Sequence, residues 1–325
     1  MKIYRLEQPH GEFIEAVVPD PIVKAGEVLV RIHASGVNPL DTKIRAGEAE
    51  HAKQPLPAVL GLDMAGVVEE VGEGVAGFQR GDEVFGMTGG VGGLQGSLAE
   101  LVAVDARLLA HKPTRLSMRE AAALPLSAIT AWEGLVDRAA VHAGQKVLIH
   151  AGAGGVGHIA VQIAKAFEAE VFATVSPQKT NIVAGLGATP VDYQALSVQE
   201  YVAKYTDGAG FDVIYDTVGG TALDDSFAAV RRYTGHVLSC LGFGTHALAP
   251  LSFRGATYSG VFTLLPLITG EGRLHHGEIL SAVTELVDEG KLKPILASER
   301  FNVSTIGQAH ALVALGSLGK VVIEF

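Results

Sequence analysis

The chain has 325 residues, of which 48% are hydrophobic and 18% are charged, so it holds enough apolar side chains for about two globular domains. This composition excludes a disordered chain and a coiled coil. The formal net charge of −10 argues against nucleic acid as the main partner, and the single cysteine, Cys240, excludes an internal disulfide and a four-cysteine zinc lobe.

No segment has the pattern of a targeting or membrane sequence. Residues 1–12 carry several charges and no apolar stretch of signal-peptide length. The most apolar segment, residues 261–269, contains Pro266 and is far shorter than the roughly 20 residues of a membrane helix. We therefore expect a cytoplasmic protein without a membrane partner, and a reducing compartment suits the lone cysteine.

The first third of the chain has the pattern of short β-strands. Residues 28–33 and 65–71 are strand-like, and glycine turns separate and follow them. This pattern predicts a β-barrel or sandwich domain over residues 1–122. Residues 86–96 are very rich in glycine and no clear helix follows them, so we expect a flexible loop and not a phosphate cradle.

The pattern changes at Ser117, which forms a Ser-x-x-Glu capping box with Glu120 and predicts a helix start. Strands and helices then alternate, which predicts an α/β domain with a doubly wound parallel sheet over residues 123–265. The expected strands are residues 146–150, 170–175, 211–215 and 236–240, and the expected helices include 127–138, 156–167 and 178–186.

The last part of the chain, residues 266–325, contains a predicted helix over 278–289 and a strand over 320–325. A terminal strand needs a sheet to join, so we expect this segment to return to the first domain. His275 and His276 are adjacent in sequence, so their side chains diverge, and we expect both on the surface rather than at a metal.

The sharpest motif is Gly-x-Gly-x-x-Gly at Gly152, Gly154 and Gly157, because it follows a strand and opens an amphipathic helix. Gly152 permits the tight turn, Gly154 allows the backbone to approach a pyrophosphate, and Gly157 allows the helix to pack on the strand. The free N–H groups at the helix start, near Gly155 and Val156, then stabilise the anion. The motif predicts a dinucleotide site.

The next strand identifies the dinucleotide. An NAD site usually has an acidic residue about 20 positions after the motif, where it binds the ribose 2′-hydroxyl. This chain has Ser176 and Lys179 there instead. Because a hydroxyl and a cation bind a 2′-phosphate that an acid would repel, we predict NADPH as the cofactor. The alternative for Lys179 is a solvated lysine in a first helical turn.

With these motifs the chain resembles the medium-chain dehydrogenase/reductase superfamily and, within it, the zinc-independent quinone oxidoreductases. The resemblance covers nearly the whole chain and is carried by the glycine motif together with residues 34–45, 57–66, 81–84, 124–132, 211–216 and 319–322. It implies a GroES-like β-barrel catalytic domain, a Rossmann domain, a cleft between them and a homodimer.

The resemblance also implies that no metal is bound. Zinc-bearing relatives have a cysteine where Asn38 stands, a histidine where Leu62 stands, and a cysteine or an acid near Leu126. Leucine side chains cannot bind zinc. Without zinc, hydride transfer to an electron-poor quinone or enone is easier than oxidation of an alcohol.

Further site residues are implied by the resemblance alone. Asn38 and Thr130 match positions that line the cofactor or substrate cleft, and the alternatives are a turn cap for Asn38 and a helix residue bonding its own backbone for Thr130. Tyr193 matches a position near the adenine, with a packing role as the alternative. Val218, Gly242 and Phe243 follow strands whose ends approach the cofactor.

Lys43 departs from the family pattern, because many quinone oxidoreductases have a tyrosine there that is suggested to contact substrate. A lysine at this position either serves the reaction, by donating a proton or stabilising an enolate oxygen, or points to solvent. We expect an NADPH-dependent oxidoreductase that reduces a quinone or quinone-like acceptor. The alternatives are an enone or alkenal double-bond reductase, a non-catalytic NADPH-binding protein, and an RNA-binding side activity that the acidic charge disfavours.

Overall fold

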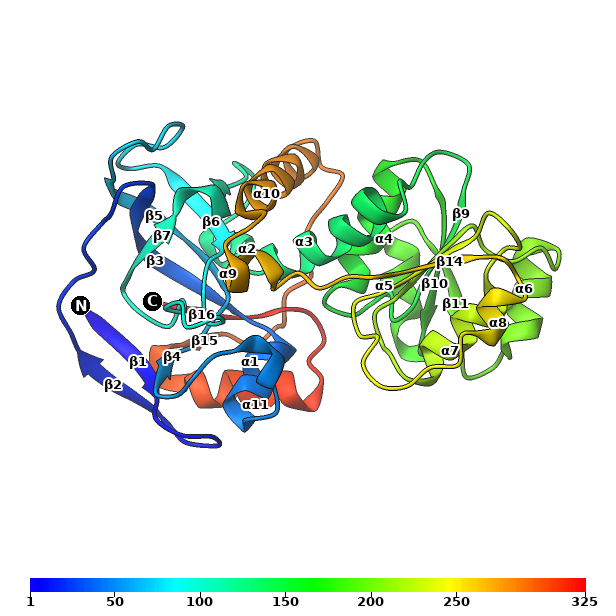
Figure 1. Cartoon of the computed structure of the whole chain (residues 1–325), viewed down its shortest axis with the longest axis horizontal. Helices are drawn as coiled ribbons and strands as arrows, with labels where there is room; N and C mark the ends of the chain where they lie inside the picture. Colours follow the sequence, from blue (N-terminus) through cyan, green and yellow to red (C-terminus); the bar gives the residue numbers. More distant parts are fainter. The chain divides into compact units, whose positions relative to one another are not determined.

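The computed structural model describes residues 1–325, which divide into two compact units (Figure 1). Unit 1 comprises Met1–Ile129 and Leu264–Phe325, and unit 2 comprises Thr130–Thr263. Unit 1 is therefore built from two separate stretches of chain, whereas unit 2 is continuous.

Unit 1 contains two β-sheets. The larger has seven strands in the order β15-β16-β3-β5-β6-β8, with β7 also paired to β3, and the smaller has the order β2-β1-β4. Gly66 permits the close pairing of β3 and β5, because a Cβ atom there would lie 2.1 Å from the carbonyl oxygen of Arg31. The strands are β1 (Lys2–Leu6), β2 (Phe13–Val17), β3 (Glu27–Val37), β4 (Ala58–Val59), β5 (Asp63–Val71), β6 (Glu83–Met87), β7 (Leu101–Asp105), β8 (Leu109–His111), β15 (Phe301–Asn302) and β16 (Val321–Glu324).

Two helices of unit 1 begin at capping boxes. The Ser117–Glu120 capping box is confirmed, since the Ser117 N–H donates to the Glu120 carboxylate over 2.8 Å at the start of α2. Asn38 precedes α1, and its N–H donates to Asp41 in the first turn. The helices are α1 (Pro39–Ala46), α2 (Met118–Ala121), α9 (Leu265–Thr269), α10 (Arg273–Asp288) and α11 (Ile306–Leu315).

The C-terminal segment returns to unit 1, as predicted, because β16 pairs antiparallel with β3 in the larger sheet. Two expectations for unit 1 are wrong. His276 is 1% exposed, because α10 begins at Arg273, earlier than predicted, and turns this residue inward. Residues 87–91 are buried, and the following Gly92 N–H donates to the Ala52 carbonyl, so this part of the glycine-rich loop is packed and hydrogen-bonded where a flexible loop was expected.

Unit 2 contains a six-stranded sheet in the order β11-β10-β9-β12-β13-β14, and every pair of neighbours is parallel. The strands are β9 (Lys146–Ile149), β10 (Glu170–Val175), β11 (Thr189–Asp192), β12 (Val213–Asp216), β13 (His236–Ser239) and β14 (Thr257–Gly260). The helices are α4 (Gly157–Ala166), α5 (Thr180–Gly185), α6 (Val198–Thr206), α7 (Thr221–Ala229) and α8 (Ala249–Ser252), and the chain enters unit 2 within α3 (Pro125–Trp132), which a π-helix (Glu133–Arg138) follows.

Helices cover both faces of this sheet. On one face, Ile214 of β12 belongs to a buried cluster with Tyr201 of α6 and Phe227 of α7. The adjacent side chain, Tyr215, points to the other face, where its ring lies so close to Gly134 of the π-helix that no Cβ would fit. Successive side chains of a strand alternate between faces. The predicted doubly wound parallel sheet is therefore confirmed.

Candidate functional site

A cavity of about 710 Å³ in unit 2 lies where the strands β9, β10, β11 and β12 end. Ligands of parallel α/β sheets bind at this edge, beyond the carboxyl ends of the strands. Of the residues predicted to bind the cofactor, five line the cavity: Gly154, Ser176, Lys179, Tyr193 and Val218. The fold thus brings together residues from four separate loops.

The glycine motif has the close packing that the sequence predicts. A Cβ atom on Gly152 would lie 2.4 Å from that of Ala173, and a Cβ atom on Gly157 would lie 2.1 Å from the carbonyl oxygen of Ala151. Gly154 is less crowded, with the Ala151 oxygen 3.1 Å from the position of its missing Cβ. Because Gly154 lines the cavity just before the N-terminus of α4, this turn fits a phosphate group.

The remaining predicted cofactor residues do not line this cavity. Gly155 is exposed and Val156 is partly exposed in the same turn. Gly242 and Phe243 follow β13, where a Cβ on Gly242 would lie 2.4 Å from the hydroxyl of Tyr258. Phe243 is 55% exposed.

The end of β10 carries a hydroxyl and a cation toward the cavity and no acid. Ser176 and Lys179 both line it, and the one carboxylate among the lining residues, Asp225, comes from α7. Burial, together with the neighbouring Asp224, raises the pKa of Asp225. This wall therefore suits a 2′-phosphate better than a free 2′-hydroxyl.

Several lining residues were not predicted from the sequence. They come from the segment between β11 and α6, from α6 itself and from the first residues after β9: Leu196, Ser197, Gln199, Tyr201 and His150. A signal for the first group is present, since Ser197 and Glu200 form a second capping box that starts α6. The capping box predicts where α6 starts, but it does not indicate that this helix start faces a ligand.

Unit 1 holds a buried polar cluster around Asn38. The Asn38 side-chain amide donates to Asp63 over 2.9 Å, and its oxygen accepts a hydrogen bond from the ammonium group of Lys320. That ammonium lies 3.8 Å from Asp63, whose other oxygen accepts from the Leu126 N–H over 2.9 Å. Asp41 accepts from the Asn38 N–H over 2.8 Å. Asp63 and Lys320 are functional candidates that the sequence analysis missed.

Burial shifts the pKa of every ionisable group in this cluster. It raises the pKa of Asp41 to about 7, against the hydrogen bond from Asn38. It raises the pKa of Asp63 and lowers that of Lys320, and in each case the other member of the pair opposes the shift. None of these side chains is more than 5% exposed. The cluster therefore holds the Asn38 amide in one orientation.

The other two catalytic candidates lie in different units. Lys43 is an exposed residue of α1 in unit 1. Thr130 in unit 2 is 6% exposed, and its hydroxyl lies 3.0 Å from that of Thr263. The Thr130 carbonyl accepts a hydrogen bond from the hydroxyl of Tyr215 over 2.6 Å.

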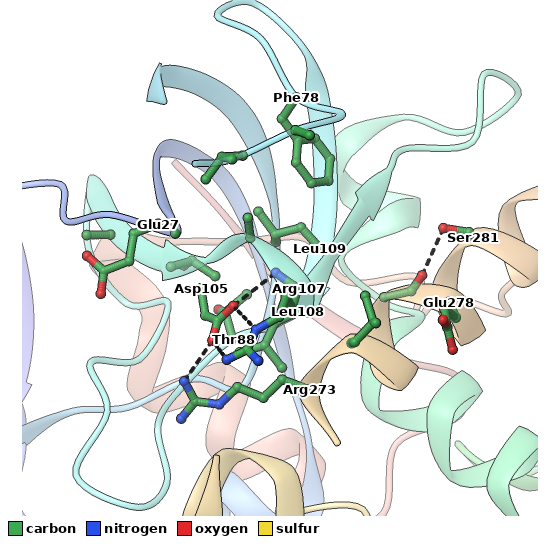
Figure 2. Close-up of a pocket in the computed structure, with 18 of the residues that line it drawn as sticks. Glu27, Phe78, Thr88, Asp105, Arg107, Leu108, Leu109, Arg273, Glu278 and Ser281 are labelled. Atoms are coloured by element: carbon green, nitrogen blue, oxygen red, sulfur yellow. Dashed lines mark hydrogen bonds and ion pairs between the residues drawn. The ribbon is translucent and has the colours of Figure 1, made fainter. Parts of the chain in front are cut away.

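A second cavity, of about 810 Å³, lies in unit 1 and contains none of the predicted site residues (Figure 2). Asp105 lies on its wall and accepts hydrogen bonds from Arg107, at 3.0 and 2.7 Å, and from Arg273, at 3.0 Å. Burial raises the pKa of Asp105, but these hydrogen bonds outweigh burial and lower it to about 2. Asp105, Arg107 and Arg273 are therefore paired with one another.

This arrangement predicts acid-sensitive stability. Because the folded state lowers the pKa of Asp105, the stabilisation is present above the unfolded pKa near 4 and is lost as the pH falls through about 2. We expect Asp105→Asn to destabilise the protein by about 2 kcal/mol at pH 7 and by about half as much at pH 3. Denaturant unfolding of both proteins at the two pH values measures this, and a gap that does not narrow would contradict it.

In each unit, comparison with known proteins finds a segment that matches a protein family. Residues 24–114 match the family model of the alcohol dehydrogenase GroES-like domain, and residues 155–269 match the zinc-binding dehydrogenase model. The chain is 36% identical over 320 residues to a 2-methylene-furan-3-one reductase of Solanum lycopersicum, covering 96% of this chain and 75% of the relative. It is 28% identical over 328 residues to the quinone oxidoreductase of Homo sapiens, covering 99% and 96%.

A solved structure extends the similarity. An alcohol dehydrogenase superfamily protein from Novosphingobium aromaticivorans superposes with a TM-score of 0.98 at 55% identity, covering 100% of this chain and 99% of that one. With the two matched domains, the parallel sheet and the glycine motif, this confirms the predicted family. The chain belongs to the medium-chain dehydrogenase/reductase superfamily, as a quinone oxidoreductase-like member.

Proposed function

We propose that the protein is an NADPH-dependent oxidoreductase that transfers hydride to a quinone or quinone-like acceptor. The observation that carries the cofactor in this proposal is the end of β10, which supplies Ser176 and Lys179 to the cavity wall and supplies no acidic residue. The acceptor rests on the similarity to a quinone oxidoreductase. A relative from Arabidopsis thaliana, 34% identical over 319 residues, is named an NADPH-dependent alkenal/one oxidoreductase, which supports the same cofactor.

In this proposal each part of the cavity has a separate task. The N–H groups at the start of α4 and around Gly154 bind the pyrophosphate, and Lys179 with Ser176 binds the 2′-phosphate. Tyr193 packs near the adenine. When bound, NADPH supplies the hydride, and the protein aligns the reactants and excludes competing reactions.

The acceptor takes up one hydride from the nucleotide and one proton. A quinone becomes a hydroquinone, with the two new hydrogens on its two oxygens, and an enone that gains hydride at its β-carbon and a proton at its α-carbon becomes a saturated carbonyl. Negative charge develops on the acceptor oxygen, and donor groups or solvent must neutralise it. We propose the hydroxyl of Thr130, the amide of Asn38 and the ammonium of Lys43 as the candidates for this role.

We infer that the reaction does not use zinc. Leu62 and Leu126 stand at positions of zinc ligands in zinc-bearing relatives and have no donor atoms. The oxygen of Asn38, at a third such position, already accepts from the cation Lys320, and one of its two amide N–H groups donates to Asp63. A positive side chain there also repels a metal ion.

An assay of NADPH oxidation tests the proposal against its alternatives. Substrates are a benzoquinone, a naphthoquinone and an α,β-unsaturated aldehyde, and loss of reduced nicotinamide absorbance is recorded with NADPH and with NADH. We expect turnover with the quinones and a preference for NADPH. Turnover with the aldehyde alone would identify a double-bond reductase, and NADPH binding without turnover would identify a non-catalytic protein.

We also propose a homodimer that forms through unit 2. Strand β14 lies at the edge of the six-stranded sheet, is largely exposed, and has no neighbour on its outer side. Such an edge offers unpaired N–H and C=O groups to a second strand. Light scattering is expected to give twice the chain mass of 33.9 kDa, and a monomer at micromolar concentration would contradict the proposal.

The protein has no helix that is long and apolar enough to cross a membrane. We propose the cytoplasm as its compartment because a sequence with one cysteine, Cys240, has no internal disulfide, and disulfides are typical of oxidising compartments. Fractionation of cells that produce the protein tests this.

A further inference from the structure

The glycine loop depends on the conformation of one residue that is not a glycine. Ala151 has a φ of 53°, in the left-handed region that side chains other than glycine rarely adopt. Its carbonyl accepts a hydrogen bond from the Gly154 N–H over 2.8 Å, and the helix start at Gly157 packs against the same carbonyl. The shape of the whole loop therefore follows from how the Ala151 peptide group is held.

A chain of hydrogen bonds holds Ala151 in place. Its N–H donates to the Thr174 hydroxyl over 3.0 Å, and this hydroxyl lies 3.2 Å from Nδ1 of His150. The other ring nitrogen, Nε2, lies 3.1 Å from the Ser226 hydroxyl, which donates to the Ala222 carbonyl over 2.7 Å. The chain thus joins the glycine loop to β10 and to the first turn of α7.

The direction of this chain follows from its ends. The Ser226 hydroxyl has one proton and gives it to the Ala222 carbonyl, so Ser226 accepts from His150 and Nε2 carries the imidazole proton. Nδ1 is then the acceptor for the Thr174 hydroxyl. The Thr174 oxygen keeps a lone pair for the Ala151 N–H.

Burial keeps the imidazole in the neutral form that this direction requires. His150 and Thr174 are each 5% exposed, and Ser226 is 0% exposed. Burial lowers the pKa of His150 to about 4, although the nearby Asp216 acts in the opposite sense. A charged imidazole would donate from both nitrogens and would reverse the bond to Thr174.

We propose that His150 and Thr174 are cofactor-positioning residues, because their hydrogen bonds hold the Ala151 turn in the shape that receives the pyrophosphate. This inference rests on the proposed function, since it takes NADPH as the ligand of the loop. In this proposal the hydrogen bonds of His150 and Thr174 shape the part of the cavity that binds the pyrophosphate. Lys179 belongs to a different part, which binds the 2′-phosphate. NADPH and NADH both contain the pyrophosphate, so these hydrogen bonds are expected to contribute equally to the binding of the two nucleotides.

The test compares two threonines that make the same kind of contacts. Like Thr174, Thr206 is buried, and its hydroxyl donates to one group and accepts a backbone N–H, here that of Gly210. It lies at the far end of α6 from the residues that line the cavity. Thr206→Val therefore reproduces the loss of a buried hydroxyl without touching the loop.

We expect Thr174→Val to raise the Kd of NADPH and of NADH by the same factor, about tenfold, because the partly buried Ala151 N–H loses its acceptor. Thr206→Val is expected to leave both Kd values within about twofold, and Thr174→Ser to restore affinity within about threefold. Deuterium exchange of the peptide that carries Ala151 is expected to speed up in ligand-free Thr174→Val and to stay slow in Thr206→Val.

Ser226→Ala separates positioning from direct contact, because Ser226 is not among the residues that line the cavity. We expect it to weaken both nucleotides about threefold and to add little to Thr174→Val in the double variant. Unchanged Kd values in Thr174→Val, or an equal loss in Thr206→Val, would overturn the positioning role. If the wild-type protein binds neither nucleotide, the proposed function is wrong, and so is the cofactor-positioning role of His150 and Thr174.

Discussion

Lys320→Met is expected to lower the melting temperature by about 10 °C. Methionine keeps the apolar stem but removes the ammonium group, so Asp63 loses its buried cation and the Asn38 oxygen loses its donor. Removing one partner of a buried ion pair costs about 3–5 kcal/mol, because the remaining charge stays buried without compensation. In a unit of this size each kcal/mol corresponds to roughly 2–4 °C, which calorimetry resolves.

The matched control is the double variant Lys320→Met with Asp63→Asn. It removes both charges, and the Asn38 amide can turn its oxygen toward the new amide group. We expect this variant to regain at least half of the lost melting temperature, because the cost arises from an unpaired charge. If Lys320→Met melts within about 2 °C of the wild type, the ion pair does not stabilise unit 1.

Lys179→Glu is expected to raise the Kd of NADPH about 100-fold while changing the Kd of NADH less than about threefold. The substitution removes a charge-assisted hydrogen bond to the 2′-phosphate and places a negative charge beside it. NADH has no phosphate at that position, so only its general electrostatic environment changes. Fluorescence titration of the two reduced nucleotides gives both constants.

Lys179→Gln is the control for the charge reversal. It removes the cation without adding repulsion, so we expect about a tenfold loss for NADPH and no loss for NADH. An equal loss for both nucleotides, or none for either, would overturn the assignment of Lys179. Because Thr174→Val is expected to affect both nucleotides alike, the two variants report on different halves of the cavity.

Local rules predicted the parts of the fold that depend on neighbouring residues. The conformation of the glycine motif could be predicted because the glycines are visible in the sequence. The structure has no room for a Cβ atom at Gly152 or Gly157. The helix start at Ser117 could be predicted because both residues of its capping box are close together in the sequence. The place of Lys179 and Ser176 on the cavity wall could also be predicted, since both follow a strand of the predicted parallel sheet.

The parts that sequence reasoning missed depend on contacts between distant segments. Lys320 and Asn38 are 282 positions apart, and a lysine at the start of a strand is usually solvated, so nothing nearby marks it as buried. The glycine-rich loop has a flexible composition, but a bond such as that from Gly92 to Ala52 orders it. His150 is visible in the motif, yet its partners Thr174 and Ser226 come from other elements.

The two-part construction of unit 1 determines the order in which a nascent chain can mature. Unit 2 is one continuous segment, so all six of its strands have left the ribosome before residues 321–324 are made. Until then unit 1 lacks β16, one of the strands that pair with β3, and the buried carboxylate of Asp63 has no ammonium partner before Lys320 is made. Since domains fold as units during synthesis, unit 2 can fold while unit 1 still lacks β16 and Lys320.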